Sequence, residues 1–225
     1  MQKTKVGCCG FAAAREKYYE NFTVVEIQKT FYQPPQEKTA EKWRKEAPAD
    51  FEFTLKAWQL ITHPPKSPTY RKLKLQIPEK EKKNYGFFKP TDEVFQAWEK
   101  TEKIASILKA KVIVFQCPRS FQPTEENTKN LEQFFKKIKR KDYLFAWEPR
   151  GHWKEDEVVK LCDKLDLICC VDPFKNNPHR QNIGYFRLHG KGGYRYKYAD
   201  SDLKELREIS TQFPKVYCMF NNVCM

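Results

Sequence analysis

The sequence predicts a parallel α/β fold that closes into a (β/α)8 barrel, and two observations predict it. Eight short apolar runs recur along the 225 residues, and segments with helical periodicity lie between most of them. This alternation is typical of a parallel sheet. An open doubly wound sheet usually has fewer strands and a glycine-rich first crossover, and the G-x-G-x-x-G fingerprint is absent. The runs are KVGCCG (5–10), VVEIQ (24–28), FEFTLKA (51–57), KVIVFQ (111–116), YLFAWE (143–148), LICCVD (167–172), YFRLHG (185–190) and VYCMFN (216–221).

Helices are expected between these runs wherever apolar side chains recur at helical spacing. Thr124 suits a helix start because two acidic residues follow it, and Asp200 or Ser201 is expected to cap the last helix. The predicted helices cover 39–47, about 91–108, the stretch after Thr124 up to 138, 154–165 and 201–212.

The interval between residues 63 and 90 differs from the other connections. It is long, basic, aromatic and interrupted by prolines, and it follows the third apolar run. Loops longer than about 15 residues within a compact domain are usually functional or disordered. We therefore expect one barrel domain over residues 1–225 with a loop insertion at about 63–90.

The chain is strongly basic, with 42 Lys and Arg residues against 29 Asp and Glu residues, a formal net charge of +13. An anionic partner such as nucleic acid or a phosphorylated metabolite would suit this charge. A surface rich in Lys and Glu is also typical of proteins from thermophiles. Both explanations stay open at this point.

No segment approaches the roughly 20 apolar residues that a membrane-spanning helix requires, and the N-terminal MQKTKVG has no signal-peptide pattern. We expect a cytoplasmic protein without a membrane partner. The eight cysteines include no C-x-x-C pair, so we interpret most of them as small buried side chains. A thiolate metal site, or a disulfide in a hyperthermophile, is the alternative.

Polar and ionisable residues end nearly every apolar run, although a buried strand would not normally contain them. Because all strands of a barrel run in the same direction, these ends should meet at one rim. Side chains two residues apart share a face, which places Arg187 with His189, and Glu148 with Arg150, on the inner side. The predicted rim residues are Glu26, Lys56, Gln116, Glu148, Arg150, Asp172, Arg187, His189, Asn221 and Asn222.

Of these residues, Glu26, Glu148 and His189 are the candidates for proton transfer, because carboxylates and imidazole are the usual general acids and bases. The other seven are candidates for substrate binding, since Lys56 and Arg187 suit an anionic ligand. In the alternative interpretation the carboxylates form structural ion pairs with these cations. No cofactor is favoured. A divalent metal held by carboxylates and His189 remains open, although the neighbouring cations would repel it.

Two segments interleave cations with aromatic rings that could stack on bases. One lies in the long loop and the other follows the seventh run, so both follow strand ends. The candidate nucleic-acid contacts are Tyr70, Arg71, Lys72, Arg195, Tyr196 and Lys197.

Six segments, taken in order, resemble the YecE-like family of uncharacterised TIM-barrel proteins, a domain of unknown function, over essentially the whole chain. They are VEIQKTFYQPP, FEFTLKAWQLITH, VIVFQCPRSF, WEPRGHW, YFRLHG and MFNN. The resemblance implies a TIM barrel, but it implies no reaction, because the family has no established activity.

The chain departs from the family pattern in three places. Cys8-Cys9-Gly10-Phe11 stands where the family has a Thr-Ser-Gly-Trp-like segment, so Cys9 is either a packed residue or a thiolate nucleophile. Gln28-Lys29 stands where Asn-Ser often follows. The sequence ends at MFNNVCM, where relatives continue with a final helix, so we expect that helix to be absent from this chain.

Together these patterns predict an enzyme, a hydrolase or a lyase, that acts on a small anionic substrate at the rim by general acid–base chemistry. The alternative is a nucleic-acid-binding barrel, including a metal-assisted phosphodiesterase. The sequence leaves the reaction, the substrate and the oligomeric state open.

Overall fold

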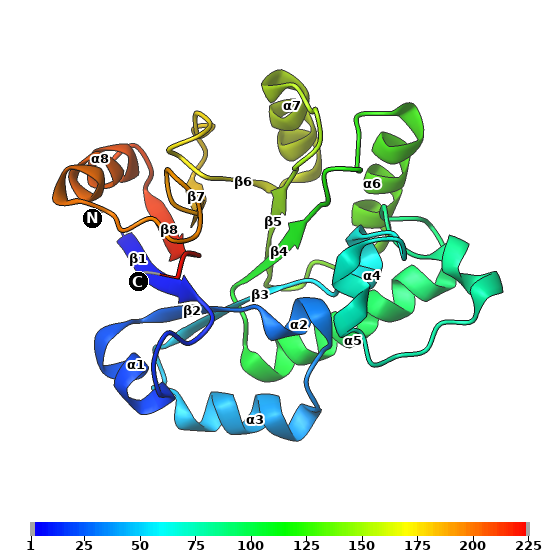
Figure 1. Ribbon diagram of the computed structural model, residues 1–225, viewed down its shortest axis with the longest axis horizontal. Coiled ribbons are helices and arrows are strands. Elements are labelled where there is room, and N and C mark those ends of the chain that lie inside the picture. The colour runs from blue at the N-terminus through cyan, green and yellow to red at the C-terminus, as the bar shows by residue number, and fades with distance from the viewer. Residues whose placement is uncertain (1–2, 224–225) are drawn as a thin grey trace.

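The computed structural model describes residues 3–223 and shows a closed barrel of eight parallel strands in the order β1 to β8, with β8 pairing back to β1. The helices lie outside this ring (Figure 1). The predicted (β/α)8 barrel is thereby confirmed. The strands are β1 (Lys3–Cys9), β2 (Val24–Ile27), β3 (Glu52–Lys56), β4 (Val112–Gln116), β5 (Leu144–Glu148), β6 (Ile168–Val171), β7 (Ile183–Leu188) and β8 (Lys215–Phe220).

Most connections carry a helix. All five predicted helices agree with the structure to within two residues at either end, including the helix predicted at 201–212, which is found at Asp200–Ser210. Three short helices early in the chain were not predicted, because each has too few residues to show a periodicity. The helices are α1 (Arg15–Asn21), α2 (Lys29–Tyr32), α3 (Glu37–Glu46), α4 (Gln59–Thr62), α5 (Asp92–Leu108), α6 (Glu125–Lys137), α7 (Glu155–Leu165) and α8 (Asp200–Ser210).

Of the two predicted helix N-caps, the one of α6 is found and the one of α8 is not. The Thr124 side chain accepts a hydrogen bond from the Asn127 backbone N–H at 3.2 Å, as predicted for the start of α6. The prediction that Asp200 or Ser201 caps α8 is wrong, because the N-cap residue is Ala199. Asp202, in the first turn, accepts the Ala199 N–H at 2.8 Å and so stabilises that end from inside the helix.

The connection between β6 and β7 is an exception to the alternation, because residues 172–182 form no helix. Residues 221–223, the part after β8 that the structure describes, also form none. On β1, Val6 has 41% of its surface exposed. The outward-facing residues of β8, Val216 and Cys218, are instead buried in a cluster with Leu206 of α8.

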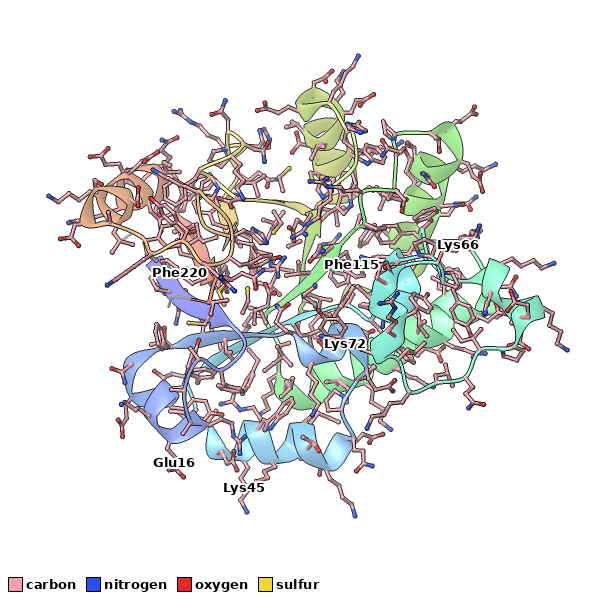
Figure 2. All side chains as sticks on the ribbon, viewed as in Figure 1. Glu16, Lys45, Lys66, Lys72, Phe115 and Phe220 are labelled. Carbon is pink, nitrogen blue, oxygen red and sulfur yellow. The ribbon has the colours of Figure 1, made fainter. Side chains whose placement is uncertain are left out.

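Strand parity separates two layers of the core. The cluster that fills the barrel interior takes buried residues from six different strands and includes Val24, Val114, Ala146, Tyr185 and Tyr217. The alternate strand positions face the helices and include the aromatic residues of β4 and β5. In Figure 2, Phe115 of β4 lies within the ribbon, whereas Glu16 and Lys45 project away from it. Parity therefore leaves the inner strand ends free to build a site.

The segment at 63–90 is folded onto the barrel and contains two 3₁₀ helices, η1 (Pro68–Lys72) and η2 (Glu79–Asn84). The backbone N–H groups of Gly86 and Phe88 each donate a hydrogen bond of 2.9 Å to carbonyl groups of α4. Gly86 has a φ of 79°, and a Cβ there would lie 2.4 Å from the His63 carbonyl oxygen. Glycine is thus required where this segment closes onto the barrel. No helix in residues 3–223 has the length and apolar character needed to cross a membrane.

Candidate active site

Arg187, near the end of β7, is the centre of a buried charge network. Its side chain is fully buried, and its Nε lies 3.2 and 3.1 Å from the two carboxylate oxygens of Glu26 on β2. Its Nη1 donates to Glu148 Oε2 of β5 at 2.5 Å and to Gln116 Oε1 of β4 at 3.2 Å. One guanidinium group therefore joins two carboxylates and an amide from three strands. Removing either partner of a buried ion pair usually destabilises the folded protein strongly.

Glu26 lies beneath Arg187 and is fully buried. The Tyr185 hydroxyl donates to its Oε2 at 2.8 Å, and the Gln28 amide donates to its Oε1. The Cys9 Sγ lies 3.5 Å from the same Oε1. Burial, followed by the Glu26 charge, raises the pKa of the Cys9 thiol well above its ordinary value, so Cys9 is a packed thiol here.

Glu148 is held as a carboxylate by two guanidinium groups. Its Oε1 accepts hydrogen bonds from Arg150 Nε and Nη2 at 3.0 and 2.9 Å, while its Oε2 faces Arg187. Burial alone would raise the pKa of Glu148, but the charges of Arg187 and Arg150 outweigh it and hold this pKa at about 2. Glu148 is therefore ionised throughout the neutral range.

His189 lies between Arg150 and Asp172. Arg150 Nη2 is 2.9 Å from His189 Nε2, and since a guanidinium can only donate, Nε2 must be the unprotonated nitrogen. The N–H is then on Nδ1, which faces Asp172 Oδ2 at 3.5 Å. The same oxygen accepts the His189 backbone N–H at 3.1 Å. In this arrangement the Nε2 lone pair accepts the hydrogen bond of the Arg150 cation.

Lys56, at the end of β3, lies on a different part of the rim. Its side chain has 5% of its surface exposed, and its Nζ stands 3.8 Å from the centre of the Phe31 ring. Burial, followed by the charge of Arg187, lowers the pKa of Lys56 to about 7. The His63 ring packs edge-on against the same Phe31 ring at 4.9 Å, and burial lowers the pKa of His63 to about 3.

A cavity of about 590 Å³ opens beside this network, at the carboxyl ends of β5, β6 and β7. Glu148, Arg150, Asp172 and His189 line its polar side. Trp153 and the valines at 158, 159 and 171 line an apolar side. The cavity extends past β6 because residues 172–182 place no helix there.

The structure thus joins seven of the ten predicted rim residues through direct contacts. These are Glu26, Gln116, Glu148, Arg150, Asp172, Arg187 and His189. Lys56 reaches the same rim without a direct bond to them. Asn221 and Asn222 instead support the backbone. The Asn221 N–H donates to Leu188 O, and the Asn222 side chain donates to Tyr196 O, both at 2.8 Å.

Sequence reasoning missed the roles of Phe31, His63 and Thr54. The Thr54 hydroxyl lies 2.7 Å from that of Tyr185 and so fixes the phenol that donates to Glu26. Parity along FEFTLKA could have placed Thr54 on the face of Lys56. Phe31 and His63 follow strands within short helical turns, and no pattern in the sequence identifies them.

The predicted nucleic-acid residues divide into rings used within the fold and exposed cations. The Tyr70 hydroxyl donates to His63 O at 2.8 Å, and the Tyr196 hydroxyl donates to Asp202 at 2.7 Å. Lys72 stands 4.4 Å over the Tyr32 ring. The exposed cations are Arg71, Lys72, Arg195 and Lys197.

The donor set does not form a metal centre. Among residues 3–223, no group of three or more His, Cys, Asp and Glu side chains is arranged to hold a metal ion. Glu26 and Glu148, which a metal would have to bridge, have the Arg187 guanidinium between them. The seven cysteines within the described range have free thiols, and Cys224 lies outside that range.

Comparison with known proteins gives the same architecture. The profile of a family described as "Protein of unknown function DUF72" matches residues 12–224. The UPF0759 protein YunF of Bacillus subtilis is 25% identical over 92% of this chain and 79% of its own length. The crystal structure of a DUF72 family protein from Enterococcus faecalis V583 superposes with a TM-score of 0.72 at 20% identity, covering 99% of this chain and 91% of that one. A D-psicose 3-epimerase structure shares the fold more distantly, with a TM-score of 0.58 at 12% identity over 96% and 84% of the two chains.

Proposed function

This chain belongs to the DUF72 family, which includes the YecE-like proteins that its sequence resembles, and we propose that it is an enzyme that moves a proton on a small anionic organic substrate. One observation carries this proposal. His189 presents an unprotonated Nε2 to the wall of a cavity, with Asp172 behind it and the Arg150 cation beside it. A base oriented by a carboxylate next to an anion-binding group is the arrangement that proton abstraction beside a carboxylate or phosphate requires.

The roles follow from what each group can do at neutral pH. Arg150 binds the substrate anion bidentately, and turning toward that anion releases the His189 lone pair for the proton. Asp172 stabilises the imidazolium that forms. Glu148 cannot be the general acid, because its pKa of about 2 keeps it ionised, so its role is to orient Arg150.

Glu26 and Arg187 support the site without contacting the substrate. Both are fully buried and each satisfies the other, which is the structural ion pair that the sequence left open. The size of the cavity, about 590 Å³, suits a metabolite rather than a polymer. Its apolar side would accept the carbon skeleton of the substrate.

A proton-transfer assay tests the proposal before the product is known. A panel of 2-oxo acids and sugar phosphates is incubated with the protein in D₂O, and the exchange of each substrate C–H is followed by proton NMR. We expect exchange on at least one compound, and a loss of about 10²- to 10⁴-fold in His189→Asn. Binding of that compound, measured by calorimetry, should remain.

The control is His152→Asn, because His152 is an exposed histidine that does not line the cavity. This variant should exchange at the wild-type rate. Exchange that persists in His189→Asn, or an absence of exchange across the whole panel, would contradict the proposal.

The remaining expectations rest on the sequence. A cytoplasmic location, a thermophilic source, a single domain over 1–225 and nucleic-acid binding by the exposed cations stay predictions. The aromatic rings expected to stack on bases have contacts within the fold, which makes the small-molecule function the stronger of the two proposals.

A further inference from the structure

Lys56 is the single buried lysine in the part of the chain that the structure describes. Within residues 3–223, no hydrogen bond and no ion pair is found for its Nζ, which stands 3.8 Å from the centre of the Phe31 ring. A buried ammonium ordinarily requires a carboxylate partner. Here the two nearby carboxylates, Glu26 and Glu148, are already bound by Arg187. Lys56 therefore has no ion-pair partner of its own.

The groups around Lys56 hold its position and include no acidic side chain that pairs with it. The Phe31 ring contacts both Lys56 Nζ and the His63 ring, and the Thr62 hydroxyl lies 2.8 Å from His63 Nδ1. The Thr30 hydroxyl donates to the Lys56 carbonyl at 2.7 Å and fixes the end of β3. Catalytic residues of such barrels come from this end of the strands.

We propose that Lys56 is a nucleophile that forms a Schiff base with the carbonyl group of the substrate. This inference rests on the proposed function and narrows its substrate class to aldehydes and ketones that carry a carboxylate or phosphate. The unpaired buried amine and its position on the rim that Glu148 and Arg187 share are the observations that support it. The lowered pKa agrees, because a neutral amine is the nucleophilic form.

The step balances without any further reactant. The Nζ lone pair attacks the carbonyl carbon, and the C=O π electrons move to oxygen to give a carbinolamine. The carbinolamine then loses water, which consists of the former carbonyl oxygen and the two amine protons. The nitrogen lone pair forms the C=N bond of the imine, and one proton from solvent converts the imine to an iminium ion. The iminium withdraws electrons from the adjacent carbon and so makes the proton on that carbon easier to remove.

Chemical trapping on the wild-type protein tests the inference. The protein is incubated at pH 7 with pyruvate, or with acetaldehyde as an uncharged probe, in the presence of sodium cyanoborohydride. The modified lysines are then identified by peptide mass spectrometry. At pH 7 about half of Lys56 is neutral, against about one in 3,000 for an ordinary lysine. We expect Lys56 to be modified at least about 100-fold faster than any exposed lysine.

Lys72 is the internal control, because it also stands over an aromatic ring, that of Tyr32, but is exposed. The Lys56→Met variant should lose the fast adduct, and Lys72→Met should keep it. If Lys56→Met fails to fold, Lys56→Arg retains a cation over Phe31 and lacks the reactive amine. Labelling of Lys56 at the rate of Lys72, or none, overturns the inference.

The two proposals can fail separately. In wild type Lys56 should react faster with pyruvate than with acetaldehyde, because Arg150 binds the carboxylate. In Arg150→Met the adduct with acetaldehyde should persist on Lys56, whereas this preference for pyruvate should be lost. If pyruvate keeps its advantage in Arg150→Met, the anion site of the proposed function is wrong and the Schiff base stands. If the wild-type protein gives no Lys56 adduct with either probe, the Schiff base is wrong whatever the D₂O exchange shows.

Discussion

Arg187→Met is the substitution for which the structure gives the clearest magnitude. The change removes the cation that touches both buried carboxylates while keeping an unbranched apolar side chain in its place. Glu148 still has Arg150, at 3.0 and 2.9 Å, but Glu26 is left with the Tyr185 hydroxyl, the Gln28 amide and the Cys9 thiol, none of which is a cation. A fully buried carboxylate without a cation becomes protonated instead.

Protonation sets the size of the effect. Protonating a carboxyl group with an ordinary pKa of about 4.3 at pH 7 costs about 4 kcal/mol, from 1.36 kcal/mol per pH unit. This agrees with the 3–5 kcal/mol that breaking a buried ion pair usually costs. We therefore expect Arg187→Met to lower the free energy of unfolding by about 4 kcal/mol at pH 7.

The pH dependence distinguishes this cause from lost packing. In the variant the folded state holds a proton on Glu26 that the unfolded state lacks above about pH 4.3, so its stability rises as the pH falls. The deficit relative to wild type should shrink by about 1.4 kcal/mol per unit between about pH 7 and pH 5. Urea unfolding followed by tryptophan fluorescence at both pH values measures it.

Arg15→Met is the matched control, because Arg15 also pairs with a glutamate, Glu46, at 2.6 Å but on the surface. It should cost less than about 1 kcal/mol at either pH. A cost below about 1 kcal/mol for Arg187→Met, or a deficit that does not change with pH, would refute the reasoning.

Three further changes test other parts of the structure. In wild type the depressed pKa of Glu148 contributes stability that is present above about pH 4.5 and lost as the pH falls toward 2. In Glu148→Gln the free energy of unfolding should therefore fall less over this range, by up to about 3 kcal/mol, as acid unfolding followed by circular dichroism would measure. Thr124→Ala should cost about 1 kcal/mol in thermal unfolding, because it removes the N-cap of α6. If the protein binds single-stranded DNA, anisotropy should show a steep loss of affinity with salt, and Arg71→Gln or Lys197→Gln should each reduce that slope by about 0.7; salt-independent binding would argue against the nucleic-acid alternative.

The sequence predicted the barrel because strand parity and strand direction are local properties. Arg187 and His189 are two residues apart on one strand, so their shared inner face needed no knowledge of the rest of the fold. Their partners could not be predicted in the same way. Glu26 is 161 residues from Arg187, and which carboxylate a guanidinium reaches depends on barrel closure and on its rotamer.

Asn221 and Asn222 show why position at a strand end is insufficient. Both follow β8, as predicted, yet the chain turns there and the Asn222 amide bonds the backbone of Tyr196. Lys56 shows a different limit. The sequence indicated a cation for an anionic ligand, but the loss of its charge depends on burial and on Arg187 occupying both carboxylates.

The charge pattern of the rim places an imidazole and a buried amine close to three ion pairs between guanidinium and carboxylate groups. Arg187 binds Glu26 and Glu148, and so denies either carboxylate to Lys56. A carboxylate beside Lys56 would keep it protonated and unreactive. Arg150 in turn donates to His189 Nε2, which leaves the imidazole N–H on Nδ1, where it faces Asp172. The charge of Arg187 also lowers the pKa of Lys56, so replacing Arg187 should raise that pKa and slow the reaction of Lys56 with acetaldehyde, which the trapping assay measures in any Arg187 variant that folds.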